Sequence, residues 1–328
     1  MSALLPPVAN ARTIVNVLEQ RTDHPYRSGP LPCVASRRDK ATAAYLGLAI
    51  GDALGATVEF LTPNEIRQQH GVHRDLTGGG WLRLKAGQVT DDTTMSLALG
   101  DAIRARGGVE AQAAAEAFDR WMRAKPIDIG NTVRRNLITF RSSGIPEAPA
   151  SEHDAGNGAA MRTLPVALAY CGKIEEKTIA ASRAQAHVTH HNVLSDATCE
   201  TLIFMVQDFL SDGDALEIKR LRAGELVRQH PLFAFDRKRR DNPSGYVVET
   251  MQAVLQALFS TNSFEDCLID VVNRGGDADT TGAIAGMLAG ARYGLDAIPQ
   301  RWLKALNAGI YERCTRQAAN LIALSQVT

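Results

Sequence analysis

Two segments of this 328-residue chain carry glycine at every fourth position within an alanine- and leucine-rich pattern. The two stripes are Gly47, Gly51 and Gly55, and Gly282, Gly286 and Gly290. Inside a helix, glycine costs about 1 kcal/mol relative to alanine, so three in one helix need a packing reason. Positions four apart share a helix face, and a face without side chains lets two helix backbones approach closely. We therefore predict that two glycine-striped helices meet at the centre of a helical bundle.

Helical spacing also dominates the rest of the chain, whereas strand signals are scarce. Hydrophobic residues make up 45% of the chain, which is ample for a sizeable core. The pattern predicts an all-α fold with one domain after residue 40. The expected helices span residues 41–58, 93–106, 109–123, 131–142, 159–171, 175–186, 193–211, 215–229, 245–260, 264–273, 280–293 and 299–324.

Two clusters of aspartate and threonine each stand at the start of a predicted helix. They are Thr90-Asp91-Asp92-Thr93 and Asp277-Ala278-Asp279-Thr280-Thr281. Taken singly, either cluster is equally well explained by helix capping, which uses one side chain. Capping does not explain three or four oxygen ligands at both places, and crowded carboxylates repel one another unless a cation holds them. Because hard divalent cations bind such oxygens, the clusters favour a two-metal hydrolase.

The composition argues against several other classes of protein. Basic and acidic residues both number 36, so no general attraction to nucleic acid or to an anionic membrane is expected. The basic run at 237–240 is more typical of a solvated loop than of a docking patch. Five widely spaced cysteines without a CxxC pair favour free thiols in a reducing cytosol. With neither a secretory signal nor a membrane-spanning segment in view, we expect a cytoplasmic protein.

Several longer segments together resemble the ADP-ribosylglycohydrolase family, in particular its bacterial branch that reactivates dinitrogenase reductase. They are GLAIGDALGATVEF, GGGWLRLKAGQVTDDTTMSLALG, GNGAAMR, AHVTHHN and NRGGDADTTGAIAGMLAGA, within residues 40–310. The resemblance implies a compact orthogonal all-α bundle with a pair of Mg²⁺ or Mn²⁺ ions at the floor of a cleft. It also implies cleavage of the N-glycosidic bond between ADP-ribose and an arginine side chain.

The resemblance assigns metal ligands position by position. The two sets are Thr90, Asp91 and Asp92 for one ion, and Asp277, Asp279 and Thr280 for the other. Asp279 would bridge the two ions.

The same resemblance implies three catalytic acids, which are Asp128, Glu59 and Asp92. Asp128 aligns with an acid placed over the ribose, and Asn131 lies one helical turn further on. Glu59 falls in a mobile acidic loop, as a metal ligand or a water-positioning acid, although a solvated glutamate at a helix end explains its position equally well. Two ions would hold the ribose and lower the pKa of a bridging water, while an acid protonates the guanidine or opens the ribose ring.

The substrate contacts are expected in three further segments. Small residues at 156–162 let backbone amides approach an anion, although on the residues alone a loop turn before a helix is favoured. The expected contacts there are Gly156, Asn157, Gly158 and Met161. The histidines at 187, 190 and 191 lack a second soft-ligand cluster, so we expect them to line the cleft, with His187 contacting ADP-ribose. Tyr246 is expected beside the nucleotide, with a core tyrosine as the alternative.

Residues 1–38 precede the matching segment, which leaves 39–328 as the expected catalytic domain. The extension has five prolines and surplus positive charge, so it is either a partner-binding arm or a strap without a partner. We expect a hydrolase that removes ADP-ribose from modified proteins such as dinitrogenase reductase. The alternative is an immunity protein whose extension also blocks an ADP-ribosyltransferase toxin. Intact acids at every metal position disfavour a third possibility, an inactive relative.

Overall fold

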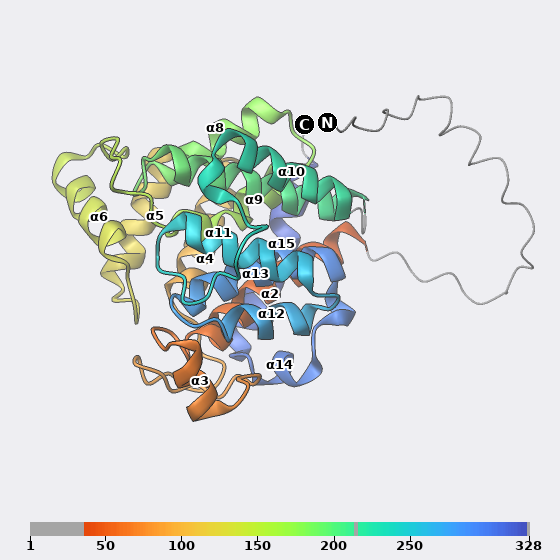
Figure 1. Ribbon diagram of the computed structural model, residues 1–328. Coiled ribbons are helices and arrows are strands. Elements are labelled where there is room, and N and C mark those ends of the chain that lie inside the picture. Colours follow the sequence, from red (N-terminus) through yellow and green to blue (C-terminus); the bar gives the residue numbers. More distant parts are fainter. Residues whose placement is uncertain (1–35, 213–215, 327–328) are drawn as a thin grey trace, which may run out of the picture. The chain divides into compact units, whose positions relative to one another are not determined.

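A computed structural model describes residues 36–212 and 216–326. Regular structure in these two ranges is helical, and β-pairing there is limited to isolated antiparallel bridges of Gly79 with Leu84 and of Gly156 with Tyr246. The predicted all-α fold is therefore confirmed for the described residues (Figure 1). None of the described helices combines the length and the apolar composition needed to cross a bilayer. The extension predicted at 1–38 lies outside the described residues as far as residue 35.

The helices keep their order along the chain as follows. They are α2 (Arg37–Gly55), α3 (Pro63–His70), α4 (Asp91–Arg106), α5 (Ala111–Arg123), α6 (Asn131–Ser143), α7 (Leu164–Ala169), α8 (Glu175–Ala186), α9 (Val193–Asp212), α10 (Leu216–Gln229), α11 (Val247–Ser260), α12 (Phe264–Val272), α13 (Ala278–Tyr293), α14 (Gln300–Ala305) and α15 (Ala308–Ser325). Short 3₁₀ helices are η1 (Ala160–Arg162), η2 (Pro231–Phe233) and η3 (Leu295–Ala297).

Helices α2 and α13 lie antiparallel in the middle of the bundle, as the glycine stripes predict (Figure 1). A Cβ atom on Gly51 would lie 1.9 Å from the carbonyl oxygen of Gly282, so the two backbones touch without intervening side chains. At the end of the contact, a Cβ atom on Gly55 would lie 2.1 Å from the carbonyl oxygen of Ala278. The C-terminal end of α2 therefore meets the N-terminal end of α13.

Two of the predicted helices are interrupted. The segment 159–171 divides into η1 and α7, because Pro165 has no N–H to continue a helix and instead occupies the first turn of a new one. The segment 299–324 divides before Asn307, whose N–H donates to the carbonyl oxygen of Gly87 at 3.0 Å and whose side chain caps α15. A contact with a distant loop thus ends α14.

Helix α3 is present although the helical spacing does not predict it. Its start is a capping box, in which the Thr62 hydroxyl accepts from the Glu65 N–H at 3.4 Å and the Glu65 carboxylate accepts from the Thr62 N–H at 2.7 Å. Pro63 occupies the first turn. These cap residues are a readable signal for a helix too short to show clear periodicity.

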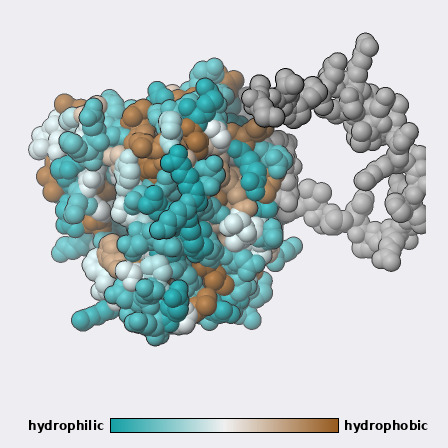
Figure 2. All heavy atoms as spheres, viewed as in Figure 1, coloured by the Kyte–Doolittle hydropathy of each residue, from teal (hydrophilic) through white to brown (hydrophobic). Residues whose placement is uncertain are grey.

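The apolar side chains of the described residues are concentrated in one core. The face drawn in Figure 2 is mostly hydrophilic, with apolar side chains in small separate groups. The core contains the free thiols of Cys171, Cys199, Cys267 and Cys314, as predicted, whereas Cys33 lies outside the described residues.

Candidate active site

The ends of α2, α4 and α13 open into a cavity of about 460 Å³. Most of the predicted site residues lie in its wall, namely Glu59, Asp91, Asp128, Asn131, Gly156, Asn157, Gly158, Met161, Asp277, Asp279 and Thr280. Thr90 and Asp92 are buried next to this wall without lining it. The chain therefore brings together, in one cleft, residues that are far apart in the sequence.

The densest group of acids lies where α2 and α13 meet. Carboxylate oxygens of Glu59, Asp277 and Asp279 lie within 4.8 Å of one another. Glu59 follows the end of α2, whereas Asp277 and Asp279 begin α13, so the backbone contact between these helices sets the spacing of the acids.

A buried acid that the sequence reasoning did not assign holds the second cluster. Asp52, on α2, accepts hydrogen bonds from the N–H of Thr90 at 2.9 Å and from the N–H of Thr93 at 3.1 Å. Its carboxylate also accepts from the hydroxyls of both threonines, at 2.9 and 2.5 Å. The first turn of α4, which carries Asp91 and Asp92, is thereby fixed to α2. A lone charge inside the most apolar helix was the available signal for this residue.

Burial makes the ionised forms of these acids unfavourable. It raises the pKa of Asp52 to about 6, against the opposing effect of its threonine hydrogen bonds. Burial and the nearby Asp128 and Asp52 carboxylates raise the pKa of Asp91 to about 7. Burial, with Asp277, Asp128 and Asp91 adding to it, raises the pKa of Glu59 to about 8. The cleft therefore lacks compensating positive charge.

Two further acids show the same strain. Burial raises the pKa of Asp92 and of Asp279 well above the ordinary value, and neighbouring carboxylates increase both shifts. Oδ1 of Asp92 is buried and has no hydrogen-bond partner among the described residues. An oxygen set with unused acceptors and excess negative charge fits hard divalent cations, which neutralise such carboxylates and coordinate their oxygens.

Neighbouring side chains hold the acids in place. The indole N–H of Trp81 donates to Oε2 of Glu59 at 2.6 Å, and the side-chain amide of Asn157 donates to Oδ2 of Asp277 at 2.7 Å. The N–H of Thr280 donates to Oδ1 of Asp279 at 2.9 Å. Each of these three acids thus has one donor, which orients it and leaves lone pairs for a ligand.

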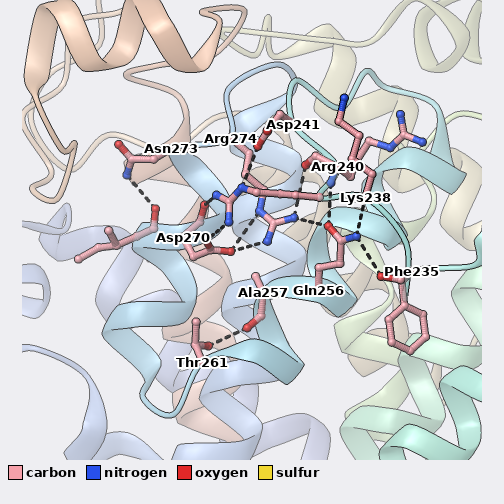
Figure 3. Close-up of polar contacts among 12 residues, drawn as sticks. Phe235, Lys238, Arg240, Asp241, Gln256, Ala257, Thr261, Asp270, Asn273 and Arg274 are labelled. Atoms are coloured by element: carbon pink, nitrogen blue, oxygen red, sulfur yellow. Dashed lines mark hydrogen bonds and ion pairs between the residues drawn. The ribbon is translucent and has the colours of Figure 1, made fainter.

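A buried arginine fixes the loop that carries Asp277. Arg274 donates from Nη2 to Oδ2 of Asp270 at 2.5 Å and from Nη1 to Oε1 of Gln256 at 2.7 Å (Figure 3). The N–H of Asp277 donates to the carbonyl oxygen of Pro243 at 2.8 Å, so this loop is tied to the segment that follows the basic run.

The basic run at 237–240 is itself part of this network (Figure 3). Arg239 donates to Oδ1 of Asp270 at 2.5 Å, and the N–H of Arg240 donates to Oε1 of Gln256 at 2.8 Å. Half of the run is therefore engaged by acidic and amide side chains of the protein.

His190, rather than His187, is the histidine of this segment that lines the cleft. Its Nδ1 lies 2.8 Å from the hydroxyl oxygen of Thr189, which also accepts from Nη2 of Arg162 at 2.8 Å. The hydroxyl proton therefore points to Nδ1, and the ring carries its own proton on Nε2. Burial lowers the pKa of His190 to about 3, so the ring is neutral. It can donate a hydrogen bond into the cleft.

The structure places His187 outside the cleft wall, contrary to our expectation. Its Nε2 lies 2.9 Å from Oδ1 of Asp196, and its ring stacks on that of His191 at 3.8 Å between centroids. The three histidines follow the end of α8, where a difference of three positions turns a ring toward a different neighbour. Tyr246 is also absent from the wall, although it borders the cleft by pairing with Gly156.

The buried acids predict a pH dependence of the metal-free protein. A carboxyl group whose pKa is raised on folding stabilises the fold below its ordinary pKa, and this contribution is lost as the pH rises through the raised value. With the pKa of Asp52, Asp91 and Glu59 raised to about 6, 7 and 8, chelator-treated protein should melt at a lower temperature near pH 8.5 than near pH 6. Mn²⁺ should reduce the difference. Equal melting temperatures without metal would contradict the prediction.

The chain is similar to characterised proteins over nearly its whole length. The ADP-ribosyl-[dinitrogen reductase] glycohydrolase of Rhodospirillum rubrum is 50% identical over 293 residues, which cover 88% of this chain and 98% of that protein. The ADP-ribosylarginine hydrolase Tri1 of Serratia proteamaculans is 32% identical over 314 residues, covering 88% of this chain and 81% of that protein.

The fold and the family model agree with these relatives. A solved structure of an ADP-ribosylglycohydrolase-related protein complex superposes with a TM-score of 0.79 at 35% identity, covering 89% of this chain and 99% of that one. The sequence model of the ADP-ribosylglycohydrolase family matches residues 34–328. The resemblance inferred from the motifs is thereby confirmed, and the chain belongs to the ADP-ribosylglycohydrolase family.

Proposed function

We propose that this protein is a divalent-metal-dependent hydrolase that removes ADP-ribose from modified arginine side chains. The observation that carries the proposal is the cleft in which Glu59, Asp277 and Asp279 converge, in a chain half identical to a glycohydrolase acting on an ADP-ribosylated protein. Incubation with an ADP-ribosylarginine peptide and Mn²⁺ should release ADP-ribose and restore the mass of the unmodified peptide. A peptide that stays modified would contradict the proposal.

Two cations, Mg²⁺ or Mn²⁺, complete the proposed site. Glu59, Asp277 and Asp279 would hold one side of the pair, and Asp91 and Asp92, with the hydroxyls of Thr90 and Thr280, would provide the remaining oxygens. When bound, such ions supply positive charge for the ribose oxygens and acidify a water molecule. Asp279 is the proposed bridging ligand, because it is nearly buried between the two groups of acids.

The protein's own residues orient the substrate and move its proton. The reaction adds the oxygen of water to the anomeric carbon, breaks the bond to nitrogen and leaves a protonated guanidine. Asp128 lines the cleft and accepts the N–H of Ile129 at 2.7 Å, which fixes its carboxylate. It is the proposed acid for the guanidine, whether it protonates the nitrogen directly or first assists opening of the ribose ring.

Replacing Asp128 by asparagine should therefore separate binding from turnover. The amide keeps the volume but lacks a titrating proton, so kcat should fall by about 10²-fold or more while KM and Mn²⁺ binding change little. Steady-state kinetics and Mn²⁺ titration measure these quantities. A rate near that of the wild type would show that Asp128 is not the acid.

The nucleotide is proposed to lie against the neutral part of the wall. Gly156 and Gly158 leave room beside His190, because a Cβ atom on either would lie within 3.0 Å of its ring. Asn131, Asn157 and Met161 complete this region, with Tyr246 at its border. The proton on Nε2 of His190 and the absence of carboxylates among these residues suit the ribose and diphosphate of ADP-ribose.

Dinitrogenase reductase is the proposed protein substrate, because the relative from Rhodospirillum rubrum is matched over 98% of its length. The toxin-blocking alternative depends on the extension, most of which lies outside the described residues, and the relatives do not support it. A cytoplasmic location is part of the proposal, since the described cysteines are free thiols, which suit a reducing compartment.

We also propose that residues 1–38 form an addition to a catalytic domain at 39–328. Removal of residues 1–34 should leave the rate on a small ADP-ribosylarginine substrate within about two-fold of wild type, since every proposed ligand lies after residue 50. The truncation keeps Ser36, whose hydroxyl accepts the N–H of Asp39 at 3.1 Å and caps α2. An unfolded or inactive truncated protein would assign the extension to the core.

A further inference from the structure

The described residues include three exposed aromatic side chains of phenylalanine, tryptophan or tyrosine, and all three lie at the cleft. Tyr246 is at the border proposed for the nucleotide. Phe60 and Trp81 line the cavity beside Glu59, and their side chains are 63% and 53% exposed. Their ring centroids lie 5.5 Å apart at an interplanar angle of 46°. Two large apolar rings thus form a solvent-exposed pair at the mouth of an acidic site.

The backbone of Phe60 is held in an unfavourable conformation. Its φ is +64°, in the left-handed region that residues with a side chain rarely adopt. Its N–H donates to the carbonyl oxygen of Gly276 at 2.7 Å, and the N–H of Gly276 donates to that of Leu61 at 3.0 Å. The loop before Asp277 therefore imposes this conformation. A strained residue whose ring is also exposed gains little for the fold, which points to a function at the cleft.

Trp81 is presented by a tight loop of glycines. Gly78, Gly79 and Gly80 all have positive φ, and Gly79 pairs with Leu84 to close the loop around the tryptophan. The indole N–H donates to Oε2 of Glu59, so one edge of the ring is fixed to the acid while the ring lines the cavity.

The charge around the ring pair selects a cation. Glu59 lies next to Trp81, and carboxylates of Asp277, Asp128 and Asp91 are close enough to raise its pKa. A diphosphate would be repelled here, whereas a cation is attracted both by the carboxylates and by the faces of aromatic rings. The guanidinium of arginine is planar and stacks on such faces.

We propose that Phe60 and Trp81 bind the guanidinium group of the modified arginine and so determine the enzyme's preference for arginine-linked ADP-ribose. This inference rests on the proposed function and adds to it the surface that recognises the leaving group. It assigns the acidic and aromatic part of the cleft to the arginine and leaves the part around Gly156 and His190 to the nucleotide.

Two variants test the ring pair separately from the chemistry. Phe60→Gly removes one ring and suits the positive φ, and Trp81→Leu removes the other ring but also the donor to Glu59. For each, kcat/KM on an ADP-ribosylarginine peptide should fall about ten-fold, while the inhibition constant of free ADP-ribose should stay within about two-fold of wild type. Arginine methyl ester, used as a product inhibitor, should lose affinity in parallel. Phe60→Gly is the decisive variant, because its side chain does not hold Glu59.

Other outcomes would overturn the inference. Equal weakening of ADP-ribose binding would show that the rings hold the nucleotide, and unchanged kinetics would show that they bind neither part. A wild-type enzyme that leaves the arginine peptide intact in Mn²⁺ would instead overturn the proposed function, and this inference with it.

Thermal melting provides a structural control. Phe60→Gly should melt at or above the wild-type temperature, because it relieves an unfavourable φ and exposes no core. Lys125→Gly is the matched control, since Lys125 is an exposed residue with a φ of +58° that does not line the cavity. This variant should also keep its stability, but with unchanged kinetics. A marked loss of stability in Phe60→Gly alone would show that Phe60 serves the fold, and would overturn its assignment as a binding residue.

Discussion

Replacement of Asp279 by alanine should lower the hydrolysis of ADP-ribosylarginine by several orders of magnitude while leaving the bundle folded. Asp279 lies within 4.8 Å of Glu59 and Asp277, so its loss removes a shared ligand from the proposed pair of ions. The remaining carboxylates then repel one another with less cation to hold them. Asp91→Ala should have a similar effect from the other side of the cleft. Initial rates, Mn²⁺ titration and circular dichroism of both variants measure activity, metal binding and fold.

The matched control for these variants is an acid of the surface. Asp296 is exposed and lies outside the cavity wall, so Asp296→Ala should keep full activity and metal affinity. Chelation of the wild-type enzyme should abolish turnover, and added Mn²⁺ or Mg²⁺ should restore it. Full activity after exhaustive chelation would contradict the two-metal proposal at once.

Substitution of Gly51 by alanine should strongly destabilise the fold, although alanine is the better helix former. The added methyl group would lie 1.9 Å from the carbonyl oxygen of Gly282, and backbone cannot turn aside as a side chain can. Helices α2 and α13 must separate along their contact, so we expect a loss of at least about 3 kcal/mol in the free energy of unfolding. Urea denaturation followed by circular dichroism provides the measurement.

Gly224 offers a matched control for this substitution. It lies within α10, and a Cβ atom added to it would have no neighbouring atom within 4 Å, so Gly224→Ala should stabilise the protein by about 0.5–1 kcal/mol. Equal effects of the two substitutions would contradict a close backbone contact at Gly51.

Much of the fold and the site could be predicted because the relevant signals are local and redundant. A glycine stripe has few uses other than close packing, so Gly51 and Gly282 predicted the central pair of helices. An acid cluster at a helix start also has few explanations once it occurs twice. The convergence of Asp91 and Asp279 in one cleft followed from these two patterns together.

The remaining features depend on contacts that no local pattern records. Asp52 is a single acid in an apolar helix, and its role appears only when α4 is placed against it. His187 and His190 have equivalent sequence contexts, and tertiary packing decides which ring reaches the cleft. The end of α14 is likewise set by a bond from Asn307 to the distant Gly87.

The carboxylate of Asp52 also has a consequence for how the chain folds. Thr90 begins α4 without capping it through its own side chain, and the free N–H groups of the first turn are satisfied by an acid 38 residues earlier. A helix start capped by another helix is not formed by local interactions alone. The turn that carries Asp91 and Asp92 therefore acquires its geometry only when α2 has docked. Local fraying at this end would break the contact with α2, so the ligand array should open and close with the bundle as one cooperative unit.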